Sequence, residues 1–247
     1  MNRLIIALSM LLTATAVSAA GGGHVLYTFE PDAKNTSSVQ RGAKYFMNYC
    51  SGCHSMEYLR FNRLAQDHAI PDDLLSKLMF TTDKPGEHIL SAMPQEKAAE
   101  WFGQAPPDLT LTARLRGADW VYSFLKSFYL DDSKATGTNN LQLPGASMPH
   151  VLGGLQGYQV LGEEEHHDGA GGHHGPVEPP FELVVDGELS AKEYDGVVAD
   201  LVNFMSYAAE PGKAKMHDRG FWALLYVIFI LIPLTYAIKR EFWKDVH

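Results

Sequence analysis

The chain has 247 residues and a formal net charge of −9; 46% of its residues are hydrophobic and 20% are charged. This composition excludes a largely disordered chain, and the acidic balance argues against a general nucleic-acid-binding protein, which needs a basic face. Cys50 and Cys53 are the only cysteines, which excludes a disulfide-stapled scaffold and a four-cysteine metal site.

Residues 1–20 have the organisation of a secretory signal peptide. Arg3 precedes an apolar run from Leu4 to Leu12, and small residues follow up to Ala20. Because the run is short for a bilayer span, a cleaved signal is favoured over an uncleaved anchor. We therefore expect residues 21–219 to form an exported domain in the periplasm.

The first part of this domain predicts helices separated by long, proline-punctuated loops. The expected elements are a helix over 42–59, a loop-rich stretch up to residue 117, a helix over 119–129 and a loop over 137–157. No internal repeat is present. The pattern indicates a mostly α domain with long loops.

The second part contains an insert and a final helix. Residues 163–180 are rich in Gly, His and Pro, and two interpretations stay open: a solvated segment without function, or a divalent-metal site within 163–175. Asp186-Gly187 is a turn signal and predicts a short hairpin over 181–189. A capping pattern at Ser190 then predicts a helix that ends near Ala209.

The C-terminal region predicts one transmembrane helix. Residues 221–238 carry no charge, and at a rise of about 1.5 Å per residue they cover roughly the apolar thickness of a bilayer. We place the span at residues 220–239. Since the N-terminal part is expected to be exported, the tail 240–247 is expected in the cytoplasm of a single-pass inner-membrane protein.

The string Cys50-Ser51-Gly52-Cys53-His54 carries the chemistry. On a helix, Cys50, Cys53 and His54 face one side, so two thiols can add to the vinyl groups of a haem while the imidazole reaches its iron. A thioredoxin-like site needs a βαβ setting and a zinc ribbon needs a second cysteine pair, and the sequence has neither. We therefore predict one covalent haem c, attached at Cys50 and Cys53, with His54 as an axial iron ligand.

The other axial position has two candidates in Gly- or Pro-framed loops, Met93 and Met148. Four methionines are less suitable. Met47 and Met56 lie on or beside the helix expected to carry the cysteines. Met205 lies in an apolar helical stripe, and Met216 lies next to the membrane. Met148 lies far enough along the chain to wrap around the haem. From the residues alone, both Met93 and Met148 remain open.

The chain resembles the cytochrome c1 family over nearly its whole mature length. The resemblance rests on Arg41-Gly42, the attachment string 49–54, the segments 105–110, 113–120, 144–149 and 209–211, and the single C-terminal anchor. It implies a cytochrome c-like fold with Met148 as the sixth iron ligand and Met93 as runner-up. It also implies that Arg116, or alternatively Arg114, pairs with a haem propionate and that Pro107 packs near the haem.

The resemblance further implies a place in the quinol–cytochrome c oxidoreductase, the cytochrome bc1 complex. The chain is then expected to pass single electrons from a Rieske iron–sulfur protein to a c-type cytochrome, with cytochrome b as a further partner in a dimeric complex. It has no catalytic residues of its own. Three alternatives stay open: a stand-alone tethered cytochrome serving a terminal oxidase, a haem sensor or enzyme with an open sixth position, and a metal-binding protein acting through the His-rich insert.

Overall fold

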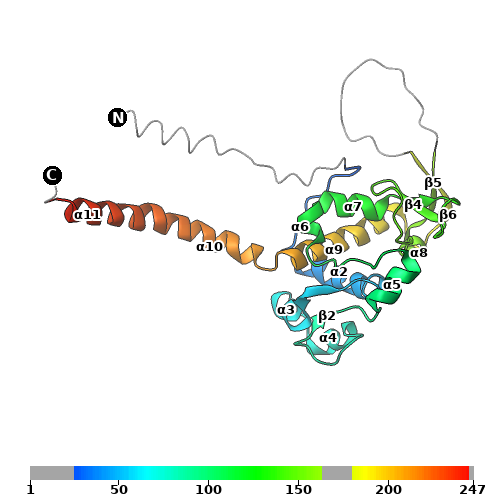
Figure 1. Cartoon of the computed structure of the whole chain (residues 1–247), viewed down its shortest axis with the longest axis horizontal. Coiled ribbons are helices and arrows are strands. Elements are labelled where there is room, and N and C mark those ends of the chain that lie inside the picture. The colour runs from blue at the N-terminus through cyan, green and yellow to red at the C-terminus, as the bar shows by residue number, and fades with distance from the viewer. Residues whose placement is uncertain (1–24, 163–179, 245–247) are drawn as a thin grey trace, which may run out of the picture.

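The structure is a computed structural model that describes residues 25–162 and 180–244 (Figure 1). The expected signal peptide and most of the expected insert lie outside these residues. Figure 1 shows a helical domain from which one long helix projects. The helices are α2 (Thr36–Tyr49), α3 (Phe61–Asp67), α4 (Asp72–Leu78), α5 (Gln95–Phe102), α6 (Thr112–Arg116), α7 (Ala118–Lys126), α8 (Gly153–Gln156), α9 (Ala191–Ala209), α10 (Lys213–Tyr226), the π-helical turn η1 (Val227–Leu231) and α11 (Ile232–Phe242).

The strands form small antiparallel pairs at the edges of this helical body. They are β1 (Met56–Arg60) with β2 (His88–Ile89), β3 (Phe128–Leu130) with β4 (Thr138–Asn140), and β5 (Gly157–Leu161) with β6 (Phe181–Asp186). The expectation of a mostly helical domain with one C-terminal membrane helix is confirmed.

The core lies where α2 crosses α9 (Figure 1). The two helices come so close at Gly42 that an added Cβ would lie 2.7 Å from the Cβ of Phe204 and even closer to the carbonyl group of Asp200. Phe46 and Phe204 pack beside this point with ring centroids 5.5 Å apart, and both are fully buried. A residue without a side chain is therefore needed at position 42.

An ion pair fixes the same crossing. Asp200 on α9 accepts hydrogen bonds from Arg41 Nε at 2.6 Å and from Ser38 Oγ at 2.6 Å, both on α2. Asn203 also donates to Ser38 Oγ at 2.8 Å. These bonds satisfy polar groups that the crossing buries.

The bounds of the first helix differ from the expected 42–59. The helix starts earlier, at Thr36, because the side chain of Asn35 caps it by accepting from the Ser38 N–H at 3.1 Å. It ends at Tyr49, before the cysteines, and the chain then turns into β1, which pairs with β2. Local periodicity could not reveal the pairing of β1 with β2, because β2 lies far from β1 along the sequence.

Three further expectations are wrong. The stretch 137–157, expected to be loop, contains β4 and α8. The stretch expected to be loop up to residue 117 contains α3, α4, α5 and α6. The hairpin expected around Asp186-Gly187 does not form; instead β6 pairs with β5 across the intervening segment, with Gly157 opposite Asp186 and Leu161 opposite Phe181. Gly187 packs tightly against the backbone of Gly157 and Leu155. This close packing explains why position 187 is a glycine although no tight turn forms there.

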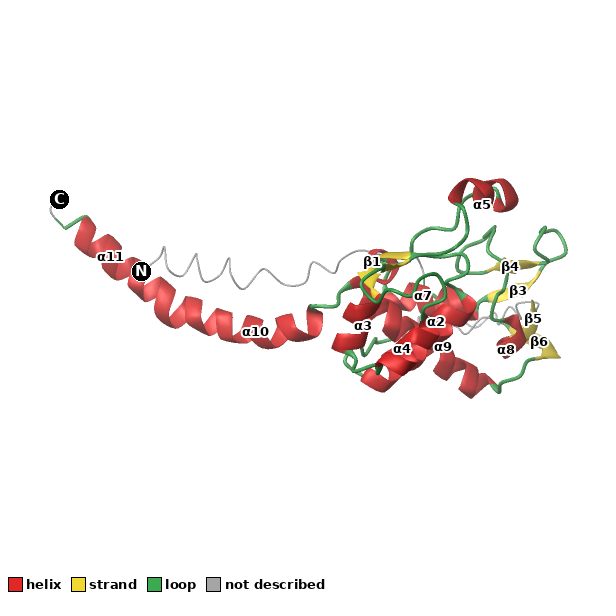
Figure 2. Cartoon of the chain, turned by 90° about the horizontal axis from the view of Figure 1, so that it is seen from below, coloured by secondary structure: helices red, strands yellow, loops and turns green. Residues whose placement is uncertain are grey.

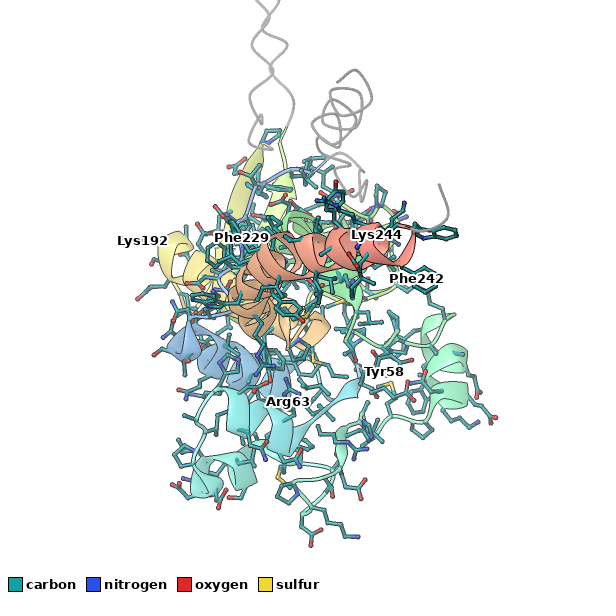
Figure 3. The ribbon with its side chains drawn as sticks, turned by 90° about the vertical axis from the view of Figure 1, so that its left-hand side faces the viewer. Tyr58, Arg63, Lys192, Phe229, Phe242 and Lys244 are labelled. Atoms are coloured by element: carbon teal, nitrogen blue, oxygen red, sulfur yellow. The ribbon has the colours of Figure 1, made fainter. Side chains whose placement is uncertain are left out.

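The last domain helix and the membrane anchor match the expectation closely. Ser190 and Glu193 form a capping box at the start of α9, and the chain from Arg219 to Phe242 is a 24-residue helical stretch, apolar and long enough to cross a membrane. Figure 3 shows Phe229 and Phe242 on this helix, and both are strongly exposed. The turn η1 ends at Leu231, two residues before Pro233, which lacks the N–H that a regular helix would use.

Candidate cofactor site

The two cysteines and His54 sit in a single turn that follows α2. The N–H of Cys50 donates to the Phe46 carbonyl at 2.8 Å, and the N–H groups of Cys53 and His54 donate to the Cys50 carbonyl at 3.0 and 2.9 Å. The helix that the sequence predicted is therefore absent here. The turn nevertheless keeps helix-like spacing, and all three side chains line one cavity.

The cavity has a volume of about 580 Å³, which includes the space open to solvent at its mouth, and its lining is predominantly apolar. Its wall is built from three parts of the chain: the turn that holds Cys50, Cys53 and His54, the end of α5 with the segment after it, and the loop before α8. The lining residues are Tyr49, Cys50, Cys53, His54, Phe102, Gln104, Ala105, Pro106, Pro107, Ser147, Met148, Pro149 and Val151. In Figure 2, α5 lies outside the α2–α9 pair. The last residue of α5, Phe102, is one of the residues that line the cavity.

His54 is oriented by a backbone carbonyl. Its Nδ1 donates to the Pro107 carbonyl at 2.8 Å, and the residue is 9% exposed. Burial lowers the pKa of His54, although the Pro107 carbonyl and the charge of Asp108 partly oppose this effect. A neutral imidazole whose Nδ1 carries the proton leaves Nε2 free to bind a metal.

The Pro107 segment is itself fastened to the chain that follows His54. The Leu109 N–H donates to the Ser55 carbonyl at 2.9 Å, and the Glu57 N–H donates to Asp108 Oδ2 at 2.7 Å. The sequence indicated only packing for Pro107. The acceptor role of its carbonyl was missed, because a backbone oxygen leaves no signature in side-chain identity.

Met148 is part of the same cavity wall. It lines the cavity together with Ser147 and Pro149, whereas Met93 is not among the described residues that line it. Met93 lies on the segment before α5, where its N–H donates to Ser91 Oγ at 3.1 Å. Of the two candidate ligands, the fold thus brings Met148 to the cavity of His54.

The two arginines considered for a propionate lie on α6 and are exposed. Arg114 Nη1 lies 3.7 Å from Glu210 Oε1. The guanidinium of Arg116 lies over the Trp120 ring, 5.0 Å from the ring centroid. Neither is among the described residues of the cavity wall. Their role toward a propionate stays a prediction.

The donor set suits a haem c rather than a bare metal ion. Burial, together with the neighbouring Cys53, raises the pKa of the Cys50 thiol to about 12, so this sulfur is uncharged at neutral pH. Among residues 25–162 and 180–244, no group of three or more His, Cys, Asp or Glu is placed to hold a metal ion. Two sulfurs for thioethers, a neutral imidazole and an apolar wall fit an iron porphyrin.

Comparison with known proteins agrees with this fit. The model of the Cytochrome C1 family matches residues 31–158. Cytochrome c1 of Allochromatium vinosum is 48% identical over the whole of both chains. The ammonia monooxygenase gamma subunit of Nitrosomonas europaea is 39% identical over 96% of both chains, and cytochrome c1 of Rhodospirillum rubrum is 29% identical over 84% of this chain and 81% of its own length. The chain therefore belongs to the cytochrome c1 family, whose members carry one covalently attached haem c and serve as the electron-transferring haem subunit of the cytochrome bc1 complex, beside cytochrome b and the Rieske protein.

Proposed function

We propose that this chain holds its haem c through thioethers at Cys50 and Cys53, with His54 and Met148 as the two axial iron ligands. The observation that carries the proposal is that both cysteines, His54 and Met148 line one apolar cavity, although Met148 comes from a distant part of the sequence. When bound, the haem supplies an iron that gains and loses single electrons.

The surrounding residues suit that task. The Pro107 carbonyl fixes the tautomer and the ring orientation of His54 and raises its basicity as a ligand. A thioether from Met148 favours ferrous iron and raises the reduction potential. Pro107 and Pro149 close the wall from opposite segments and help to exclude water.

In this proposal the chain accepts electrons from the Rieske iron–sulfur protein and passes them to a c-type cytochrome. Two protein ligands leave no iron position for a small molecule, which favours electron transfer over a haem sensor or an oxygen-activating enzyme. The acidic net charge of −9 supports a basic acceptor, because opposite charge speeds encounter in water. Family membership favours this role over a stand-alone cytochrome serving a terminal oxidase.

The proposed topology follows from the two ends of the chain. Residues 1–20 are a cleaved signal, 21–219 form the periplasmic haem domain, 220–239 span the inner membrane and 240–247 lie in the cytoplasm. The exposed apolar helix from Arg219 to Phe242 supports the span. We also propose a dimeric complex and a propionate contact by Arg116, with Arg114 as the alternative.

The experiment is a pair of matched substitutions, Met148→Leu and Met93→Leu, in the full-length haem protein in membranes. We expect Met148→Leu to lower the midpoint potential, to remove the long-wavelength band of iron–thioether ligation and to open the reduced iron to carbon monoxide. Met93→Leu should behave as wild type. Loss of these properties in Met93→Leu alone, or tight carbon monoxide binding by the native protein, would refute the proposed ligand.

A further inference from the structure

We propose that Asn139, Asn140 and His150 are positioning residues for the ligand loop, defined as residues 141–150, and that they keep Met148 directed at the haem site. The inference rests on the proposed function, in which Met148 is an iron ligand. None of the three residues is among those that line the cavity, so they act on the haem only through the loop.

Asn139 holds the middle of the ligand loop from β4. Its Oδ1 accepts from the Gly145 N–H at 2.8 Å, and its Nδ2 donates to Asp131 Oδ2 at 2.9 Å. The residue is 7% exposed. Gly145 has a positive φ of 79° and lies in a turn that the Ala146 N–H closes by donating to the Leu143 carbonyl at 3.1 Å.

Asn140 holds the start of the same loop. It is fully buried, its Oδ1 accepts from the Leu143 N–H at 3.0 Å, and its Nδ2 donates to the Phe124 carbonyl at 2.7 Å. The Leu141 N–H adds a bond of 3.0 Å to the Ser127 carbonyl. The first half of the loop is thereby tied to α7 and to the residue that precedes β3.

His150 holds the other end of the loop by ring packing. Its ring is stacked on that of Phe128 at 4.9 Å and 10°, and Tyr158 meets it edge-on at 5.9 Å. Phe128 is 2% exposed and belongs to β3, so both ends of the loop are fixed to one scaffold. His150 Nε2 is buried and has no hydrogen-bond partner in the described structure, and the ring also interacts with the Gln156 side chain and the Gly157 backbone. Stacking on Phe128 is therefore the contact that a phenylalanine at position 150 can keep.

These anchors leave residues 146–149 as a short span between Gly145 and His150. The bond from the Ala146 N–H to the Leu143 carbonyl at 3.1 Å and the ring of Pro149 restrict this span further. A short segment held at both ends has little conformational entropy to lose when Met148 binds iron. If an anchor is removed, conformations with Met148 turned away become more populated. An added ligand that needs the open iron position then binds more tightly, in proportion to the open fraction.

The test is a titration of the oxidised, full-length haem protein in detergent with imidazole, which competes with the thioether for ferric iron. Asn139→Ala removes the bond to Gly145, together with the bonds to the Asn140 N–H and to Asp131. We expect a gain of about tenfold or more in imidazole affinity, since about tenfold is the size expected when one buried hydrogen bond is lost. The midpoint potential should fall in parallel.

Gln159→Ala is the matched control. The Gln159 side chain is a buried amide on the same scaffold, and it donates to the Phe128 carbonyl at 2.8 Å and to the Lys126 carbonyl rather than to the ligand loop.

His150 provides an independent pair of variants that does not depend on the stability of Asn139→Ala. We expect His150→Ala to raise imidazole affinity and His150→Phe to restore it to nearly the wild-type value, because phenylalanine keeps the stacked ring. Equal imidazole affinity in wild type, Asn139→Ala and His150→Ala would overturn the inference. A gain in Gln159→Ala as large as in Asn139→Ala would also overturn it, since the effect would then be general destabilisation.

A Met148→Ala variant separates the two proposals. If it opens the iron to imidazole while the anchor variants do not, only the positioning inference fails. If Met148→Ala leaves both the spectrum and the imidazole affinity unchanged, the assignment of Met148 as ligand fails, and the positioning inference fails with it.

Discussion

The close approach of α2 and α9 at Gly42 yields a prediction whose size follows from the geometry. In Gly42→Ala the new Cβ would lie 2.6 Å from the carbonyl carbon of Asp200 and 2.7 Å from the Cβ of Phe204, whereas ordinary contact begins near 3.4 Å. Both are atoms close to the α9 backbone, so no flexible side chain can rotate away. The helices must therefore separate.

The shortest contact, 2.0 Å from the new Cβ to the Asp200 carbonyl oxygen, must lengthen by about 1.4 Å to reach ordinary contact. A separation of that size forfeits about half or more of the dispersion energy of the atom pairs along the crossing, which include the Phe46–Phe204 contact. Overpacking of this kind costs about 3 kcal/mol or more. Alanine regains about 1 kcal/mol through its better helix propensity. We therefore expect Gly42→Ala to lose at least about 2 kcal/mol of unfolding free energy.

Gly196→Ala on α9 is the matched control, because nothing lies within 4 Å of a Cβ added there. It should gain about 1 kcal/mol from propensity alone. The assay is guanidinium unfolding of the haem protein in detergent, followed by far-ultraviolet circular dichroism. If Gly42→Ala proves as stable as Gly196→Ala, the packing argument for this crossing is incorrect.

Three further predictions concern single groups. Asp200→Asn should lower the unfolding free energy by about 1–3 kcal/mol, since it weakens charge-assisted bonds from Arg41 and Ser38. His68→Phe should make stability less sensitive to acid between pH 7 and 5: burial lowers the pKa of His68, so the unfolded chain binds its proton more readily, and native stability is lost as the pH falls below about 6.5. Ser190→Ala should cost about 1 kcal/mol through loss of the N-cap of α9.

Each of these has a simple check by denaturant unfolding. Lys97→Ala removes an exposed ion pair with Glu100 and should change the unfolding free energy by less than about 1 kcal/mol. If Asp200→Asn loses no more stability than Lys97→Ala, Asp200 does not stabilise the helix crossing. An unchanged pH profile in His68→Phe would show that this ring does not contribute to acid sensitivity. A Ser190→Thr variant keeps the capping oxygen and should retain most of the stability that Ser190→Ala loses.

Elements whose signals are local were predictable. The α9 start depends on residues three positions apart, Ser190 and Glu193, and the membrane helix depends on a continuous apolar run; both agree with the structure. Two of the mispredicted elements depend on distant partners. The helix before the cysteines ends early where the chain turns toward the β1–β2 pair, and β6 pairs with β5 instead of folding back on itself.

The candidate site shows the same division. The spacing of Cys50, Cys53 and His54 matches the spacing that covalent haem attachment requires, and it involves neighbouring residues only, so the sequence shows it directly. The position of Met148, the carbonyl of Pro107 that orients His54, and the anchoring of the ligand loop by Asn139 could not be read from spacing. They involve backbone atoms or contacts between segments that meet only after folding.

The amino-acid sequence alone thus determined the attachment chemistry, the acidic character and the membrane anchor, because each is a property of neighbouring residues or of composition. Tertiary structure alone decided which methionine shares a cavity with His54, why Gly42 must lack a side chain, and what holds the ligand loop. Those features depend on the packing of α2 against α9 and on the attachment of the ligand loop to β3 and β4. Such packing brings together segments that are far apart in the sequence, so a local sequence pattern cannot predict the distances between them.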